Sequence, residues 1–353
     1  MNKSRAVHRV AVLVGALTVF AVSAEAHHGP STEPLYDTSE VMEFEGEVTA
    51  VFWRNPHARF RFRVTAGPQT GEIWEVETNP PGPLSRVGFP SDLLPIGSEI
   101  KVAGIVSRRK ANYMSLYNLL LPNGYEFSDM ARPNPLRFSD QKLPFDFSSM
   151  GGAEDASIEE PEGIFKVWLR SRAGQREINE SDLTEAAKAA KSNFDEWRYR
   201  ENPDCIPPGM PTGMMPPTPV QFVDERATIR LLQSEYDLVR TIHMNPFSDV
   251  DPETVPLTPL GYSVGRWEDD TLVVTTTRIN WPVADHLGAP QSTDVVLVER
   301  FTPAADGRTM AFEMISTDPA YLIGSVVTTG TYSYLPGWEM ETYDCRAWDD
   351  DAQ

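Results

Sequence analysis

Residues 58–64 read ARFRFRV, and this alternation decides the first half of the fold. Phe60, Phe62 and Val64 fall on one face of an extended chain, and the intervening arginines fall on the other. Successive side chains of a β-strand point to opposite faces of the sheet. The pattern therefore predicts a strand with one buried, apolar face.

Strand patterns continue on both sides of this segment. They occupy residues 45–53, 73–78, 99–107 and 114–121. In the second of these, Glu75 and Glu77 fall on the face opposite Trp74. A short helical turn is expected at 84–88, between the third and fourth strands. Five strands with one helix in this place are the order of a small OB-like barrel.

The second half of the chain returns to short strand patterns separated by turn residues. Nine are expected, at 220–224, 228–234, 238–244, 261–267, 271–279, 295–302, 309–316, 326–335 and 339–343. Consecutive hairpins without helices predict a larger antiparallel up-and-down sheet, closed as a lipocalin-like barrel or folded as a sandwich. The interior of a barrel of about eight strands is either filled or holds one small ligand.

The region between the two β units contains one helix. An apolar stripe at helical spacing predicts it, with Ser181 as the N-cap, through Leu183, Ala187, Ala190, Phe194 and Trp197. The expected organisation is therefore a signal peptide (1–26), an OB-like domain (27–128), a linker (129–162), a helix with a proline-rich loop (163–219) and the larger barrel (220–353). The whole chain is predicted to be mainly β, with one connecting helix.

Charge restricts the classes of partner. The 353 residues include 51 acidic and 31 basic side chains, for a net charge of −20. Nucleic acids and anionic lipid surfaces require basic patches, so neither is expected as a partner. A small-molecule ligand remains open.

The first 26 residues resemble a secretory signal. Lys3, Arg5 and Arg9 precede an apolar run from 10 to 22, and Ala24-Glu25-Ala26 fits a small-x-small cleavage site. This run is shorter than the roughly 20 residues that span a bilayer. We expect a periplasmic or secreted protein without stable membrane insertion after cleavage; the alternative is an uncleaved anchor.

The two cysteines, Cys205 and Cys345, then enter an oxidising compartment, where a disulfide persists. The alternative is a catalytic thiol, which requires electropositive neighbours. Asp204 and Asp344 directly precede the cysteines and would raise a thiol pKa. We therefore predict a structural disulfide.

Cleavage after residue 26 exposes His27 and His28 at the new N-terminus. A terminal amine beside an imidazole is a chelating pair, and His57 is the third candidate ligand. An all-nitrogen set of this kind suits copper(II) or zinc(II). Asp37 or Glu33 would add an oxygen. The alternative is a terminus without a function and a histidine that caps a turn.

Several motifs resemble an uncharacterised family of secreted bacterial proteins. They are His27-His28-Gly29, Tyr36-Asp37, Gly46-x-Val48 and Trp53-x-Asn55-Pro56-His57. Gly29 stands where serine is usual in the family. The second half resembles the β-rich domains that accompany it, in stretches such as Gly265-Arg266-Trp267-Glu268 and Glu299-Arg300-Phe301. The resemblance implies export and a two-part architecture, and it implies no activity.

Polar residues recur on the strands of the second half. His243 with Glu299 is a candidate acid–base pair, and Arg240 is a candidate carboxylate ligand beside it. Candidate ligand-binding residues are Glu235, Arg266, Trp267, Arg300 and Trp281. The alternative is that these groups lie on the solvent face as cross-strand ion pairs.

Common signatures of acyl transfer, nucleotide hydrolysis and nicotinamide chemistry do not occur in the sequence. We therefore expect an exported protein that binds a divalent metal, a small hydrophobic or carboxylate ligand, or both. One alternative is an enzyme that acts on a small hydrophobic compound in the larger barrel. A second alternative is a structural protein of the cell envelope.

Overall fold

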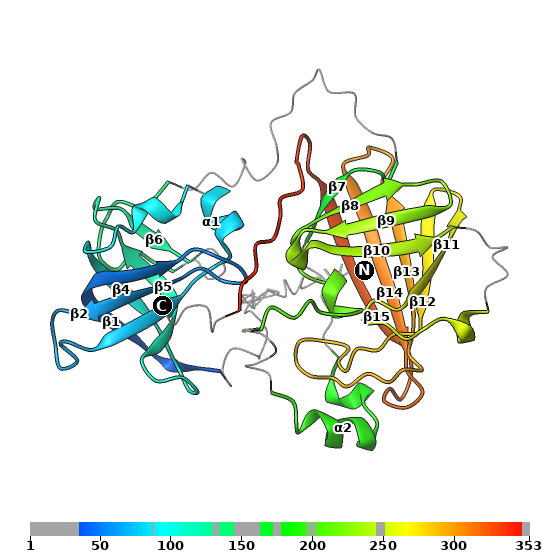
Figure 1. Cartoon of the computed structure of the whole chain (residues 1–353), viewed down its shortest axis with the longest axis horizontal. Coiled ribbons are helices and arrows are strands. Elements are labelled where there is room, and N and C mark those ends of the chain that lie inside the picture. The colour runs from blue at the N-terminus through cyan, green and yellow to red at the C-terminus, as the bar shows by residue number, and fades with distance from the viewer. Residues whose placement is uncertain are drawn as a thin grey trace, which may run out of the picture.

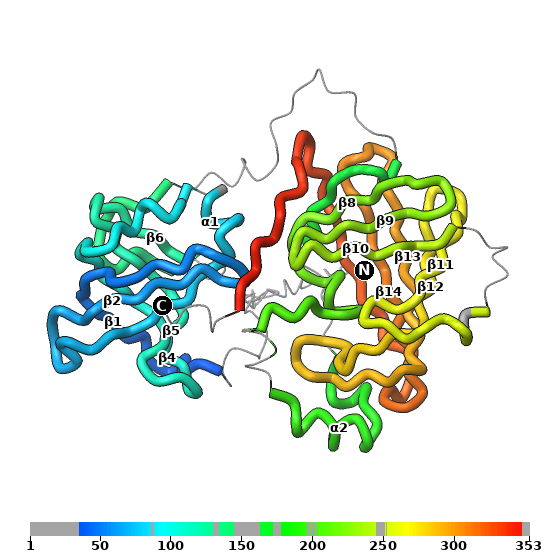
Figure 2. Tube along the Cα trace, in the orientation of Figure 1, coloured from blue at the N-terminus to red at the C-terminus, as the bar shows by residue number. Residues whose placement is uncertain are grey.

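The computed structural model describes residues 35–86, 88–129, 134–144, 163–171, 178–195, 199, 202, 204–244 and 251–347. Two β units lie side by side in Figure 1, one blue to green and the other green to orange. The C-terminal segment, in red, runs between them in both Figure 1 and Figure 2. The predicted mainly β fold is confirmed.

The first unit contains a six-stranded sheet. Its elements are β1 (Tyr36–Phe52), β2 (Arg59–Val64), β3 (Ile73–Glu77), α1 (Pro81–Arg86), β4 (Glu99–Ser107), β5 (Tyr113–Leu120) and β6 (Glu126–Ser128). The sheet order is β3-β2-β1-β4-β5-β6, and β3 also pairs with β5 in parallel. This extra pairing joins five strands in a ring, with α1 between the third and fourth strands, as in an OB-type barrel.

The alternation in β2 is confirmed by burial. Phe60, Phe62 and Val64 are buried in an apolar core with residues from all five strands of the ring. Gly46 on β1 lies directly against the ring of Phe62, and a Cβ atom there would come within 2.3 Å of its Cδ2. The closely packed core therefore holds β2 in its register with β1, and the arginines of β2 face outward.

The second unit is a closed barrel of nine strands. They are β7 (Val167–Arg170), β8 (Pro219–Asp224), β9 (Thr228–Gln233), β10 (Leu238–His243), β11 (Tyr262–Glu268), β12 (Thr271–Thr277), β13 (Val296–Pro303), β14 (Thr309–Thr317) and β15 (Val326–Tyr334). All neighbouring pairs are antiparallel except β10 and β11, which pair in parallel. This exception departs from the expected up-and-down order, and it follows from the long connection between these two strands.

The ninth strand of the barrel is not the expected one. The prediction of a strand at 339–343 is wrong, because these residues form no strand. The barrel is closed instead by β7, which pairs with β15 on one side and β8 on the other. Residues 339–345 cross toward the first unit, where the backbone of Asn55 forms a bridge with Cys345.

The connecting helix is shorter than the apolar stripe suggested. Helix α2 spans Glu185–Lys191, and Thr184 rather than Ser181 caps it, because its side chain accepts from the Ala187 N–H. Leu183 is buried in extended backbone before the helix. Trp197 lies outside the described residues.

The predicted disulfide is confirmed between Cys205 and Cys345, which are 140 residues apart in sequence. It fastens the proline-rich loop to the C-terminal segment. Met210 and Met214 of this loop are buried in the core of the larger barrel, so the loop covers one end of that barrel. None of the helices in the described part of the chain has the length and apolar character needed to cross a membrane.

Candidate functional site

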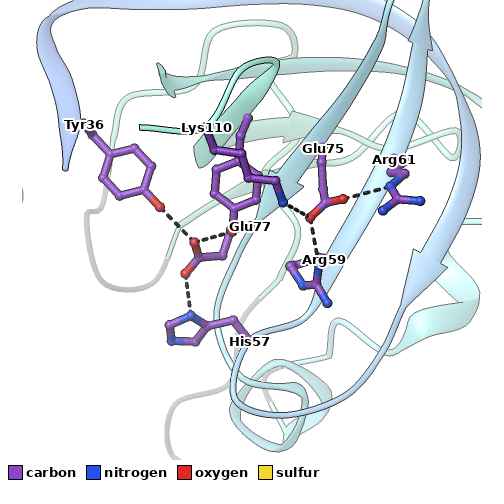
Figure 3. A network of polar contacts seen from close by, with 8 residues as sticks. Tyr36, His57, Arg59, Arg61, Glu75, Glu77 and Lys110 are labelled. Carbon is purple, nitrogen blue, oxygen red and sulfur yellow. Dashed lines mark hydrogen bonds and ion pairs between the residues drawn. The ribbon is translucent and has the colours of Figure 1, made fainter. Parts of the chain in front are cut away.

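Glu77 is the centre of a buried polar cluster on the smaller barrel (Figure 3). Strand β3 points Trp74 and Val76 into the core, so Glu75 and Glu77 lie on the opposite face. The side chain of Glu77 is only 9% exposed. Its Oε2 accepts hydrogen bonds from the hydroxyls of Tyr36 and Tyr113, both at 2.8 Å, and its Oε1 pairs with Nδ1 of His57.

These three partners define the protonation of the cluster. An ionised carboxylate is an acceptor of hydrogen bonds from such groups. A proton on Nδ1 of His57 would face Glu77 and would leave the lone pair of a neutral ring on Nε2. A carboxylate behind a histidine in this way is the usual arrangement of histidines that bind metal ions.

Glu75, two residues earlier on the same face, has a different set of partners. It receives Arg59 and Arg61 at 2.8 Å and Lys110 at 2.9 Å. Burial alone would raise the pKa of Glu75, but hydrogen bonds and charge from Lys110, Arg61 and Arg59 hold it at about 2. Arg59 and Arg61 also lie over the ring of Phe52, at 5.3 and 4.9 Å. Glu75 therefore fixes three cations beside the Glu77 cluster.

Only part of the predicted metal set can be placed. His57 lies in the connection between β1 and β2, with a third of its side chain exposed, whereas His27, His28 and Glu33 lie outside the described residues. Asp37 is placed, and its carboxylate accepts from Ser39 and pairs with Arg108 instead. Across the described part of the chain, no three His, Cys, Asp or Glu side chains gather as a metal-binding group.

Inside the larger barrel, Arg240 and Glu299 form a buried ion pair. Arg240 donates through Nη1 to Glu299 at 3.0 Å and through Nη2 to the other carboxylate oxygen. Its Nε donates to Ser263 at 2.9 Å, and Nη2 also donates to Thr276 at 2.7 Å. All four side chains are buried, so the pair is neutralised and its main donors are satisfied.

His243 does not join this pair. On β10, Leu238, Arg240 and Ile242 are buried in alternation, so His243 falls on the outer face. Its ring is half-buried and lies 4.8 Å from the ring of Tyr262. The structure therefore brings two of the three candidate catalytic residues together and leaves the third on the other side of the sheet.

The other candidate ligand-binding residues are dispersed. Arg266 and Arg300 both pair with Glu268 on the outer face, at 2.7 and 2.9 Å, and these hydrogen bonds lower the pKa of Glu268. Trp267 is exposed on the same strand. Glu235 lies in the turn between β9 and β10, and Trp281 packs against the barrel core from a loop.

Residue-by-residue reasoning missed Glu77, Tyr36 and Arg170. The alternation of β3 placed Glu77 on the outer face but carried no sign that His57 would lie against it. Arg170 is buried in the larger barrel on β7, a strand of four residues that the sequence did not reveal. The sequence pattern that could have indicated this strand was the i, i+2 spacing of Trp168 and Arg170.

The described site is thus that of a two-barrel β protein in which a buried carboxylate orients a histidine. Residues 16–115 match the family of unknown function DUF6152. The match covers the strands that carry Glu75 and Glu77 and the loop that carries His57. No curated protein and no solved structure matches the chain. The finding agrees with the expected resemblance to an uncharacterised family.

Proposed function

We propose that this is an exported protein that binds one divalent metal ion, copper(II) or zinc(II), through His57. The observation that carries the proposal is the contact between His57 Nδ1 and Glu77. Glu77 orients the ring and makes its Nε2 more basic, which is what a metal-bound imidazole requires. His27 and His28, with the terminal amine that cleavage exposes, are the proposed additional ligands.

The position of Tyr36 supports this set of ligands. Its hydroxyl binds the same carboxylate as His57, so the chain passes the candidate site at residue 36. His27 lies nine positions before Tyr36, and an extended chain of that length reaches about 30 Å. The N-terminal histidines are therefore within reach of His57.

Three neighbouring cations are held by Glu75. Arg59, Arg61 and Lys110 bond to Glu75, whereas Glu77 receives the hydroxyls of Tyr36 and Tyr113 and the imidazole of His57. Glu75 thus binds the three cations, and Glu77 binds the histidine.

Export is part of the proposal. The signal-like first 26 residues and the disulfide between Cys205 and Cys345 both support it, because disulfides persist in oxidising compartments. N-terminal sequencing of the protein recovered from the periplasm or medium tests it. A first residue other than His27 would remove the proposed amine chelate.

Isothermal titration of the mature chain with zinc chloride or copper chloride tests the metal site. We expect one equivalent bound, and about tenfold or greater loss of affinity in both His57→Ala and Glu77→Gln. His243→Ala is the matched control, since it removes an imidazole from the outer face of the larger barrel, and its affinity should stay unchanged. An unaltered affinity in His57→Ala would overturn the proposal.

The N-terminal ligands are tested separately. A variant with one serine inserted before His27 moves the amine away from the first imidazole while all three histidines remain. We expect weaker copper binding and the loss of the amine contribution from the copper absorption spectrum. The same spectrum in both proteins would exclude the amine as a ligand.

A further inference from the structure

Arg170 is a buried cation of the larger barrel that lacks an acidic partner. It lies on β7 and is 1% exposed. Its Nη1 donates to the carbonyl of Met215 at 2.7 Å, and its guanidinium lies 5.4 Å from the ring centre of Phe312. Nε and Nη2 are buried and have no hydrogen-bond partner of good geometry, although the Tyr332 hydroxyl also interacts with the guanidinium. Within the described part of the chain, no carboxylate forms an ion pair with it.

This arrangement is costly without a further group. A guanidinium remains protonated even where burial lowers its pKa, as it does for Arg170. A buried charge is ordinarily paired, because its lost hydration is otherwise uncompensated. Arg240 shows the ordinary solution in the same barrel, with Glu299 against it. Nε and Nη2 of Arg170 are adjacent in the guanidinium and match the two oxygens of a carboxylate.

A second unsatisfied group lies at the same end of the barrel. Gln233 is 1% exposed, and neither its Oε1 nor its Nε2 has a hydrogen-bond partner. Gln233 pairs with Val220, which pairs with Trp168, two residues before Arg170. Only β8 separates the two strands. A native core rarely leaves such groups unbonded, and both of these lie toward the same end of the barrel.

The surroundings define the kind of ligand. Trp168, Phe312 and Tyr332 are buried aromatic residues of the same interior, and Tyr332 lies opposite Arg170 in the strand register. Burial raises the pKa of Tyr332 to about 12, so its hydroxyl remains a neutral hydrogen-bonding group. One unpaired cation within an apolar lining suits a single negative charge with a hydrocarbon body.

A surface hollow also lies at this end of the barrel. A hollow of about 170 Å³ is lined by Gln233 and Leu238 and by Met340, Glu341 and Thr342 of the C-terminal segment. Leu238 contributes to the barrel core as well. The hollow therefore lies at the surface next to Gln233, beside the segment that the disulfide fastens.

We propose that this end of the larger barrel binds a small monocarboxylate with an apolar tail. Nε and Nη2 of Arg170 receive the carboxylate, and the amide of Gln233 provides the second polar contact. The site shares no residue with the proposed metal site and does not depend on it.

Isothermal titration of the full mature chain with octanoate and with benzoate tests the proposal. We expect saturable binding of at least one acid, and at least tenfold weaker binding in Arg170→Gln, because hydrogen bonds to a charged group are lost. Octanol, which has the same tail without the charge, should bind at least tenfold more weakly than octanoate. Arg300→Gln removes an outer-face arginine and is the matched control with unchanged affinity.

Gln233→Leu is the second test variant, to be used if Arg170→Gln does not fold. It removes two unsatisfied polar atoms, so it should fold at least as well as the parent protein while it weakens binding of the acid. His57→Ala should leave this binding unchanged, which separates the result from that of the metal titration. The proposal is overturned if neither acid binds at millimolar concentration, if octanol binds as well as octanoate, or if Gln233→Leu binds the acid as tightly as the parent.

Discussion

In the smaller barrel the charged side chains lie outside the sheet, whereas in the larger barrel several lie inside it. The apolar core of the smaller barrel draws on all five strands of its ring, and Glu75 and Glu77 lie on the outer face. The larger barrel buries Arg240, Glu299 and Arg170 within its interior. Both arrangements are buried, yet they differ in how completely the charges are balanced.

This difference separates structural networks from candidate binding sites. Glu75 has three cations around it, and Arg240 has its carboxylate and two hydroxyls. Each network is satisfied by the chain's own residues. Arg170 has one carbonyl, an aromatic ring and the Tyr332 hydroxyl, and no carboxylate in the described part of the chain forms an ion pair with it. A buried charge that the chain's own residues pair incompletely, rather than burial or charge alone, thus indicates a candidate binding site.

The largest expected effect is on the satisfied pair inside the larger barrel. Glu299→Gln leaves Arg240 without its counter-charge, and breaking a buried pair from one side costs about 3–5 kcal/mol of unfolding free energy. Urea denaturation measures the loss. The double variant Arg240→Met with Glu299→Leu should recover most of it, because no charge is then left unpaired. A double variant as unstable as the single one would show that the pair itself supplies the stability.

The outer-face network should give a smaller effect that depends on pH. The ordinary pKa of a glutamate is 4.5 and that of Glu75 is about 2 in the folded protein. Its ionisation therefore stabilises the fold by about 3 kcal/mol above pH 4.5, and this contribution is lost as the pH falls toward 2. Unfolding free energies of the parent and Glu75→Gln, compared at about pH 6 and about pH 2.5, should differ strongly at the first and much less at the second.

Glu45→Gln is the matched control for that measurement. Glu45 pairs with Lys101 at 2.6 Å on the exposed surface of the same barrel. Exposed pairs contribute little, so its effect should be small at both pH values. A gap between parent and Glu75→Gln that stays constant with pH would contradict the lowered pKa of Glu75.

The fold was largely predictable because its strands obey local rules. The alternation in residues 58–64 and the turn residues between the later strands depend only on near neighbours. Strand β7 escaped prediction because a strand of four residues has too short a pattern, and β15 and β8 select it only through tertiary pairing. The segment 339–343 has a strand-like composition, but the disulfide at Cys345 and the contact of Tyr343 with Asp237 direct it elsewhere.

The candidate sites were less predictable, because their partners are distant in sequence. His57 was found as a histidine beside a turn, but Glu77 is 20 residues away and Tyr113 is 36 residues beyond Glu77. Arg240 and Glu299 were each selected from the sequence, and their contact arises only when β10 and β13 meet across the barrel interior. Strand alternation predicts the face of the sheet on which a side chain lies, but it does not predict which residue of another strand that side chain contacts.

Arg170→Met tests whether the two buried arginines, Arg170 and Arg240, differ in their effect on stability. Arg240 has the counter-charge of Glu299, whereas Arg170 has no carboxylate partner in the described part of the chain. Replacing Arg170 with an apolar side chain of similar length should therefore raise the unfolding free energy by about 1–2 kcal/mol without added carboxylate. The gain from removing a buried charge exceeds the loss of one hydrogen bond to Met215. Urea denaturation with and without octanoate measures this. A destabilised variant in the absence of octanoate would mean that the protein already compensates Arg170.

The smallest effect is expected where charges lie outside the larger barrel. Arg300 pairs with Glu268 at 2.9 Å, and both side chains are more than one third exposed. Solvent and salt screen such a pair, so Arg300→Ala should change the unfolding free energy by less than about 1 kcal/mol. Denaturation at low and high salt measures it, and the difference should shrink at high salt. A loss of unfolding free energy as large as that of Glu299→Gln would contradict the prediction, because an exposed ion pair would then stabilise the fold as much as a buried one.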